Sequence, residues 1–137
     1  MSYDLFVFDP ASAPADNAQV LDWYKRVTKE GAVWSNDPVS ASDVLAAFYT
    51  DLKAKFPPMN GPDADLDDES PRVTGYGFLD GAVYLDFRWD VVEEAYQETL
   101  EAAERTGCGV VTISDDSTIF RPFPAADGFE LRMFRTT

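Results

Sequence analysis

The hydrophobic pattern is clearest in the middle of the chain, where two alternating segments flank a tight-turn pair. Residues 73–79 and 82–89 lie on either side of Asp80-Gly81. An Asp-Gly pair between alternating segments is typical of a two-residue hairpin loop. The sequence therefore predicts an antiparallel hairpin that begins with Leu79 paired to Ala82. The core-facing side of its second strand is predicted to consist of Val83, Leu85, Phe87 and Trp89.

Two segments before this hairpin have the spacing of amphipathic helices. The first begins at Asp16, a good N-cap, and ends at Gly31. The second begins at Ser40 or Ser42 and ends before Pro57, since proline disfavours helical geometry in the preceding residue. The predicted apolar sides are Val20, Leu21, Trp23, Tyr24 and Val27 in the first helix, and Leu45, Phe48, Leu52 and Phe56 in the second.

A third helix follows the hairpin. Asp90 and Glu93 have the spacing of a capping box, and Gly107 provides the exit. Its inward residues are predicted to be Val92, Tyr96, Leu100 and Ala103. Pro122 and Pro124 are expected to interrupt the chain after a short strand. The remaining strands are predicted at residues 3–8, 110–114, 119–121 and 129–134.

This order of elements, β-α-α-β-β-α-β, predicts an α+β domain. We interpret it as a ferredoxin-like split βαβ plan with an added C-terminal strand or hairpin and with helices on one face of a mainly antiparallel sheet. Residues 1–137 form one domain in this interpretation, with an acidic, proline-rich surface loop at 57–71 and a C-terminal extension at 122–137. The other sheet face would then expose Phe6, Phe8 and Tyr84. We expect residues 123–134 or a second subunit to cover that apolar face, which predicts a homodimer as one arrangement.

Two glycines occupy the outer face of the predicted hairpin. Gly75 pairs with Asp86 and Gly77 with Tyr84, so one strand presents almost no side chain there. Glycine within a strand indicates either a bulge or a close approach to the backbone. The sequence leaves both interpretations open, a local bend or a ligand groove.

Charge and residue usage narrow the function classes. The formal net charge is -14, which disfavours nucleic acid and favours a basic protein partner, although high solubility or an acidic proteome explains the same charge. No apolar run is long enough for a membrane span, so no membrane association is expected. The single cysteine and the lack of a basic segment after Met1 predict a cytoplasmic protein.

The chain contains no histidine, which removes the Ser-His-Asp and Cys-His catalytic sets. We predict no catalytic residue, no cofactor and no metal ion. Asp63, Asp65 and Asp67 have the spacing that begins an EF-hand loop, but Asp68 and Thr74 stand where that loop needs glycine and glutamate. An ordinary solvated loop is the preferred interpretation.

Four short motifs resemble those of an uncharacterised family of small acidic bacterial proteins. They are the opening strand Ser2 to Phe8 (SYDLxVF), the loop Phe56 to Pro62 (FPPMNGP), the strand end Phe87 to Trp89 (FxW), and Ala95-Tyr96. The likeness covers most of residues 2–121 and implies no catalytic residue. By analogy with small acidic proteins of bacterial toxin-neutralising systems, it suggests an immunity-type role.

Three functions are consistent with these patterns. The first is a non-catalytic binding module that docks a basic protein partner through the acidic side of the third helix, at Glu94, Glu98 and Glu101. The second is a small-ligand-binding protein or carboxylate-based enzyme with a pocket near Phe56 to Pro62. The third is a dimeric scaffold. The predicted pocket and interaction residues of the second hypothesis are Trp34, Met59, Asn60, Tyr84, Asp86 and Arg88.

Overall fold

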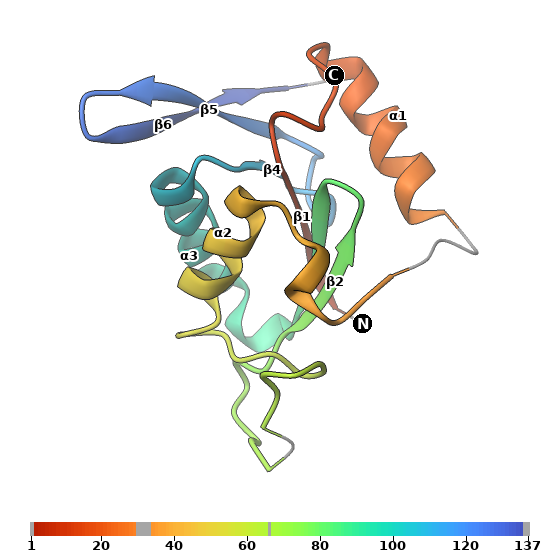
Figure 1. Ribbon diagram of the computed structural model, residues 1–137, viewed down its shortest axis with the longest axis vertical. Helices are drawn as coiled ribbons and strands as arrows, with labels where there is room; N and C mark the ends of the chain where they lie inside the picture. Colours follow the sequence, from red (N-terminus) through yellow and green to blue (C-terminus); the bar gives the residue numbers. More distant parts are fainter. Residues whose placement is uncertain (1, 30–33, 66, 136–137) are drawn as a thin grey trace.

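The computed structural model describes residues 2–29, 34–65 and 67–135. Within them, three helices accompany one six-stranded antiparallel sheet with the strand order β2-β3-β1-β4-β5-β6 (Figure 1). The mixed α+β class is therefore confirmed. The strands are β1 (Tyr3–Phe8), β2 (Gly75–Leu79), β3 (Ala82–Phe87), β4 (Gly109–Val111), β5 (Ile119–Ala125) and β6 (Gly128–Phe134). The helices are α1 (Asn17–Thr28), α2 (Asp43–Leu52) and α3 (Val92–Thr106), with 3-10 turns at Pro38–Ser40 and Trp89–Val91.

The central hairpin has the predicted register. Leu79 pairs with Ala82, and the pairing continues without a break to Gly75 and Asp86. Gly81 has a φ of +78°, a left-handed value that favours glycine in the turn. Because the ladder passes regularly through both glycines of β2, the bulge interpretation is wrong for this strand.

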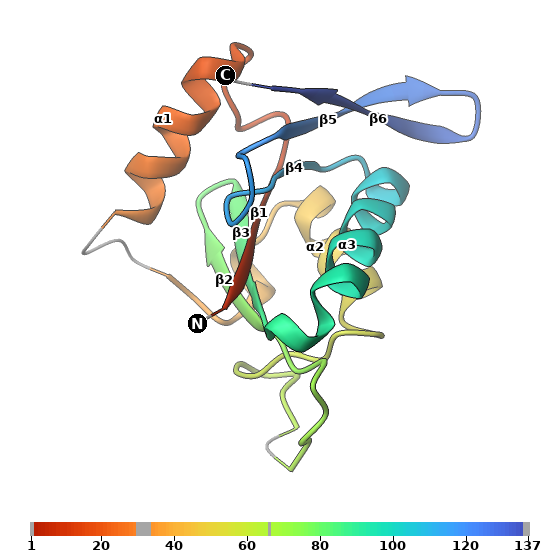
Figure 2. The ribbon, with the colours of Figure 1, turned by 180° about the vertical axis from the view of Figure 1, so that it is seen from behind.

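Helices cover both faces of the sheet, so the expectation of helices on one face is wrong. Leu5 and Val7 of β1 belong to a core shared with α2 and α3, whereas Phe6 and Phe8 belong to a second core under α1. Figure 2, a view from behind, shows α1 on the opposite side of the sheet from the other two helices. The helical spacing of residues 17–28 identifies an apolar stripe but does not determine which face of the sheet the helix reaches.

The second core explains how the supposedly open face is closed. Phe6 and Phe8 are fully buried, and the ring of Phe6 lies 5.5 Å from Trp23 and 5.0 Å from Tyr24. Of residues 123–134, which the sequence predicts to cover this face, only Phe134 packs against this cluster. The premise for a homodimer through an open sheet face is therefore wrong.

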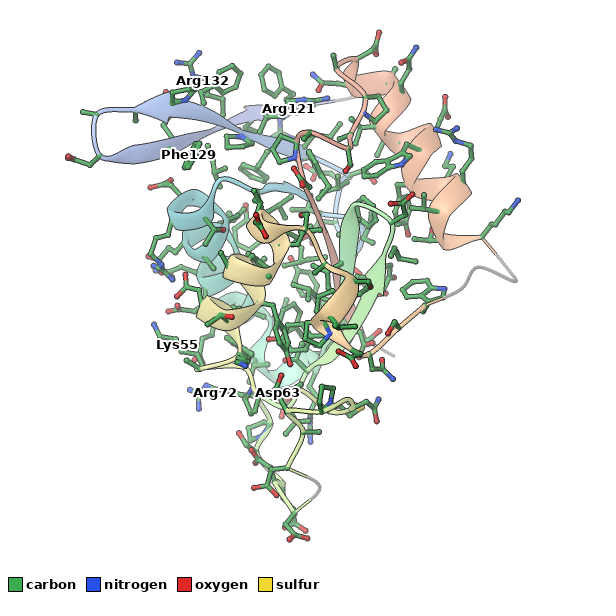
Figure 3. The ribbon with its side chains drawn as sticks, in the orientation of Figure 1. Lys55, Asp63, Arg72, Arg121, Phe129 and Arg132 are labelled. Carbon is green, nitrogen blue, oxygen red and sulfur yellow. The ribbon has the colours of Figure 1, made fainter. Side chains whose placement is uncertain are left out.

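Arg121 of β5 ties α1 to the sheet. Its Nε donates to Asn17 Oδ1 at 2.6 Å, and its Nη2 donates to the carbonyl of Pro14 at 2.8 Å. Figure 3 labels Arg121 between the base of the hairpin and the start of α1. Two charge-assisted bonds thus fix the end of α1 at which the chain enters the helix.

The helix boundaries differ in part from the predictions. Asp16 accepts a bond from the Ala18 amide and Ser42 from the Leu45 amide, so both predicted N-caps are confirmed. Helix α2 ends at Leu52, one turn before Phe56, and the predicted end of α1 at Gly31 lies outside the described residues.

Helix α3 corrects two expectations. It begins at Val92 after a 3-10 turn, with no side-chain cap, so the capping box of Asp90 and Glu93 is wrong. Its buried residues are Ala95, Thr99, Ala102 and Ala103. Of the predicted inward residues only Ala103 is fully buried, because the small side chains let α3 approach the sheet closely and leave Val92, Tyr96 and Leu100 at its margin.

The C-terminal residues form the added hairpin, β5 and β6, which projects beyond the rest of the sheet (Figure 1). The predicted chain break at Pro122 and Pro124 is wrong, since both lie within β5. Strand β4 pairs with β5 only at Phe120 and Ile119. Beyond that point β5 has no partner on its β4 side within the described chain, so an absent proline N–H costs no ladder bond.

Candidate functional site

A cleft of about 150 Å³ lies on the outer face of the β2–β3 hairpin. Three parts of the chain form it: the segment after α1, the loop after α2, and the hairpin itself. Its lining residues are Trp34, Asn36, Met59, Asn60, Gly75, Tyr76, Gly77, Tyr84 and Asp86.

Backbone hydrogen bonds fix both loops to the edge of β2. The Ser35 amide donates to the Phe78 carbonyl at 3.1 Å, and the Phe78 amide donates back at 2.7 Å. The Met59 amide donates to the Thr74 carbonyl at 2.8 Å. Trp34 and Met59 therefore adjoin backbone groups that take part in the sheet, which is a rigid way to position side chains outside it.

The two glycines of β2 make room for this arrangement. A side chain at Gly77 would collide with the Trp34 ring, which rests there instead. Trp34 also meets Tyr84 in an edge-on contact, with ring centroids 5.1 Å apart and planes at 73°. Trp34 remains 39% exposed, so a large part of its ring is open to a partner.

Asp86 supplies the charge of the cleft. It lies across from Asp4 in the register of β1 and β3, and it sits over Gly75, where a Cβ would meet its Oδ1 at 2.6 Å. Burial, and next the charge of Asp4, raise the pKa of the Asp86 carboxyl above its usual range, whereas a backbone bond from Gly75 opposes this rise. Within the described residues no lysine or arginine forms an ion pair with Asp86.

A second carboxylate, Asp4, supports the wall of the cleft. Its Oδ2 accepts a bond of 2.5 Å from the Tyr84 hydroxyl, and its Oδ1 accepts one of 2.6 Å from Ser2. Burial, followed by the bond to Asp4, raises the pKa of the Tyr84 hydroxyl, so this group stays protonated and donating. The cleft thus combines a partly buried anion with an exposed indole, a set that suits a cation.

The structure brings together five of the nine predicted site residues, namely Trp34, Met59, Asn60, Tyr84 and Asp86. Arg88 lies beyond the end of β3 and pairs with Asp90 at 3.3 Å, outside the cleft. Sequence reasoning missed Asn36, which also lines the cleft, and Asp4. Residues alternate between the two faces along β1, which puts Asp4 on the same face as Phe6 and Phe8, but its register opposite Asp86 depends on the pairing of β1 with β3.

The three acidic residues predicted on α3 lie on another part of the surface. Arg72 makes a two-pronged contact with Glu94 at 2.7 and 2.9 Å, and Lys55 contacts Glu98 at 2.9 Å (Figure 3 labels both cations). The acidic side of α3 is therefore partly neutralised by Arg72 and Lys55. The helical spacing shows the acids, whereas these cations arrive from the loop between α2 and β2.

Glu101 lies instead along a wider groove of about 520 Å³ between α3 and Tyr3. This groove is mainly apolar, and its Tyr3 hydroxyl is already bonded to Asp115 at 2.8 Å. Burial, followed by the hydrogen bond to Asp115, raises the pKa of the Tyr3 hydroxyl. The hydroxyl therefore stays protonated and keeps donating to Asp115. The smaller cleft, with a partly buried carboxylate that lacks an ion pair, is the better candidate for specific recognition.

Asp63, the first residue of the EF-hand-like spacing, interacts with side chains of the nearby helix α2 and the residue that follows it. It accepts a 2.8 Å bond from the Tyr49 hydroxyl and lies 3.4 Å from Lys53. Over the ranges 2–29, 34–65 and 67–135, no group of three acidic or cysteine side chains is arranged to hold a metal ion. In the same ranges no helix has the length and apolar character needed to cross a bilayer. The cytoplasmic location stays a prediction.

The FPPMNGP motif divides between core and cleft. Phe56 is fully buried, and its carbonyl accepts a 2.6 Å bond from the Tyr76 hydroxyl, whereas Met59 and Asn60 reach the cleft. No protein family, curated protein or solved structure matches this chain. The resemblance of its motifs to the bacterial family therefore stays a prediction.

Proposed function

We propose that this protein is a non-catalytic binding module for a basic protein partner, and that the partner inserts one lysine or arginine side chain into the Trp34 cleft. The observation that carries the proposal is the partly buried Asp86 carboxylate, which has no ion pair within the described chain. Burial of an unpaired charge costs free energy, and an entering cation would offset that cost.

The size and lining of the cleft support a side chain rather than a whole metabolite. Ligand pockets commonly enclose about 300–1,000 Å³, whereas this cleft encloses about 150 Å³. A long basic side chain can lay its methylene groups against Met59 and its charged end between Trp34 and Asp86. The net charge of -14 would steer a basic partner toward the protein from a distance.

The direct test uses blocked single residues as probes. We expect N-acetyl-lysine and N-acetyl-arginine methylamides to shift the NMR signals of the Trp34 indole and of the residue 75–77 amides. Asp86→Asn should abolish these shifts, whereas Glu69→Gln, the matched loss of one exposed carboxylate in the 57–71 loop, should retain them. Signals that stay unmoved at 100 mM probe, or that move equally in both variants, would contradict the proposal.

Capture of the partner provides a second test. Immobilised protein should retain basic proteins from a bacterial lysate at low salt and release them at high salt, because screening weakens attraction between charges. Asp86→Asn should lose those proteins and Glu69→Gln should not. A retained set dominated by acidic proteins, or one that ignores salt, would count against a basic partner.

The kind of partner and the detailed fold plan belong to the same proposal. An immunity-type role, with a basic toxin as the partner, is supported by the acidic charge and by the motif resemblance.

We also infer that β1 to β4 with α2 and α3 follow the ferredoxin-like split βαβ plan. The antiparallel order β2-β3-β1-β4 supports this inference. Helix α1 and the β5–β6 hairpin are additions in that interpretation.

The cross-strand pair of Asp4 and Asp86 favours one alternative, a protein that binds or acts on a small cationic ligand. Two neighbouring carboxyls, one with a raised pKa, are a common acid–base arrangement. A thermal-shift screen with polyamines, amino sugars and quaternary amines separates the two functions. A stabilising small amine without capture of any basic protein would favour this alternative.

A further inference from the structure

The two ends of the six-stranded sheet differ. At one end, β2 is partly sealed by the chain itself, through the paired bonds of Ser35 with Phe78 and the bonds of Thr74 with Pro57 and Met59. At the other end, no described segment pairs with the outer edge of β6. Unpaired strand edges are usually blunted or covered in native proteins, so an unpaired edge at the opposite end from a partly sealed one indicates a surface kept for pairing.

The register of the hairpin shows which backbone groups point outward. Ala125 and Gly128 flank the two-residue loop and form a hydrogen-bonded pair, so alternate residues of β6 from Gly128 onward bond to β5. Phe129, Leu131 and Met133 therefore present their N–H and C=O groups at the free edge. The positions of the prolines agree with this register, since Pro122 and Pro124 lie opposite Leu131 and Phe129, where β5 donates nothing to β6.

The side chains of β6 are complementary to a second β6. A two-fold axis through Leu131 places Glu130 opposite Arg132 of the second copy, and the symmetry repeats this pair. Both pairs would occupy positions without backbone bonds, where side chains approach most closely. Within one copy the two groups already lie 2.9 Å apart, so a dimer would join four charges of alternating sign.

The local charge of the β5–β6 hairpin also favours contact between two copies of this acidic chain. Residues 119–135 contain three arginines and two acids, whereas the whole chain carries -14. Phe129 and Met133, which the same axis places opposite each other, are 39% and 54% exposed. In Figure 3, Phe129 points toward the helices and Arg132 points to the other side, so the apolar pairs and the charged pairs would lie on separate faces.

We propose that the protein forms a homodimer in which β6 pairs antiparallel with β6 of a second copy, centred on Leu131. The outward groups of Phe129, Leu131 and Met133 supply the backbone bonds. Glu130 and Arg132 set the register.

Sedimentation velocity over about 1–500 μM tests this dimer. Glu130→Arg and Arg132→Glu each place like charges opposite each other, and each should weaken self-association roughly tenfold to a hundredfold. An equimolar mixture of the two variants should restore a dimer, because every facing pair is then of opposite sign. The double variant E130R/R132E should also restore it.

Two further variants complete the design. Met133→Pro removes an outward N–H without removing a bond to β5, and it should weaken the dimer while thermal melting shows a folded monomer. Glu69→Arg, an equal charge change far from the hairpin, should leave association unchanged. A wild-type protein that is monomeric throughout the range, or single variants that dimerise as well as their mixture, would overturn the proposal.

Discussion

Replacing Asp86 with asparagine should stabilise the protein at neutral pH while removing its proposed binding function. In the native state this carboxyl is partly buried and faces Asp4 across the strands. Asparagine has nearly the same shape as aspartate and carries no charge. The substitution therefore removes the charge and leaves the packing of the cleft in place.

The expected gain follows from the pairing of like charges. Favourable cross-strand pairs contribute about 0.2–1 kcal/mol, and we expect opposed like charges to cost a similar amount. Relief of partial burial adds a contribution that solvent screening keeps small. We expect a total of about 1 kcal/mol, which raises Tm by about 3 °C for a chain of this size. Asp4→Asn should not give this gain, because the Asp4 carboxylate accepts bonds from Tyr84 and Ser2.

The sign of the pH dependence provides a sharper test. A carboxyl whose pKa is raised by folding weakens the native state when it is ionised, and the penalty disappears as pH falls below the unfolded pKa, about 3.9. The advantage of Asp86→Asn should therefore be full near pH 7 and shrink steadily toward pH 4. Urea unfolding at several pH values measures this difference directly. A variant less stable than the wild type at pH 7, or an advantage constant down to pH 4, would refute the reasoning.

Three further predictions concern other parts of the molecule. Thr99 has a buried hydroxyl without a hydrogen-bond partner, so Thr99→Val should stabilise the fold by about 1 kcal/mol in urea unfolding, whereas Thr99→Ser should not. Gly77→Ala should displace the Trp34 ring and cost about 1–3 kcal/mol, a cost that a Trp34→Ala background should largely remove. Burial raises the pKa of the Cys108 thiol to about 12, so native protein at pH 8 should react with iodoacetamide roughly a thousandfold more slowly than unfolded protein; rapid native labelling would contradict this.

The parts of the fold that the sequence predicted depend on local patterns. The Asp80-Gly81 turn sets the register of the central hairpin, and Asp16 and Ser42 cap their helices by bonds within a few residues. The side of the sheet on which α1 packs depends instead on contacts between distant segments, such as Arg121 with Asn17. No local spacing encodes those contacts.

In the cleft too, local patterns were predictable from the sequence and contacts between distant segments were not. The glycines at positions 75 and 77 left a bend and a groove both open, whereas Trp34, whose ring lies over Gly77, is among the predicted residues. The acidic face of α3 was only partly right, because spacing along a helix does not show the cations that Lys55 and Arg72 bring from a loop. Strand β5 also exceeded its predicted length, since proline is excluded only where a strand must donate a bond.

The backbone bonds that seal β2 have a consequence for growth of the sheet. Fibres extend when each added strand presents a fresh edge to the next molecule. Here any strand that joins β6 consumes the available edge, and the opposite edge at β2 is already partly occupied by Ser35 and Met59. Addition therefore stops after one event, and a solution of this protein should stay free of filaments even when it is concentrated.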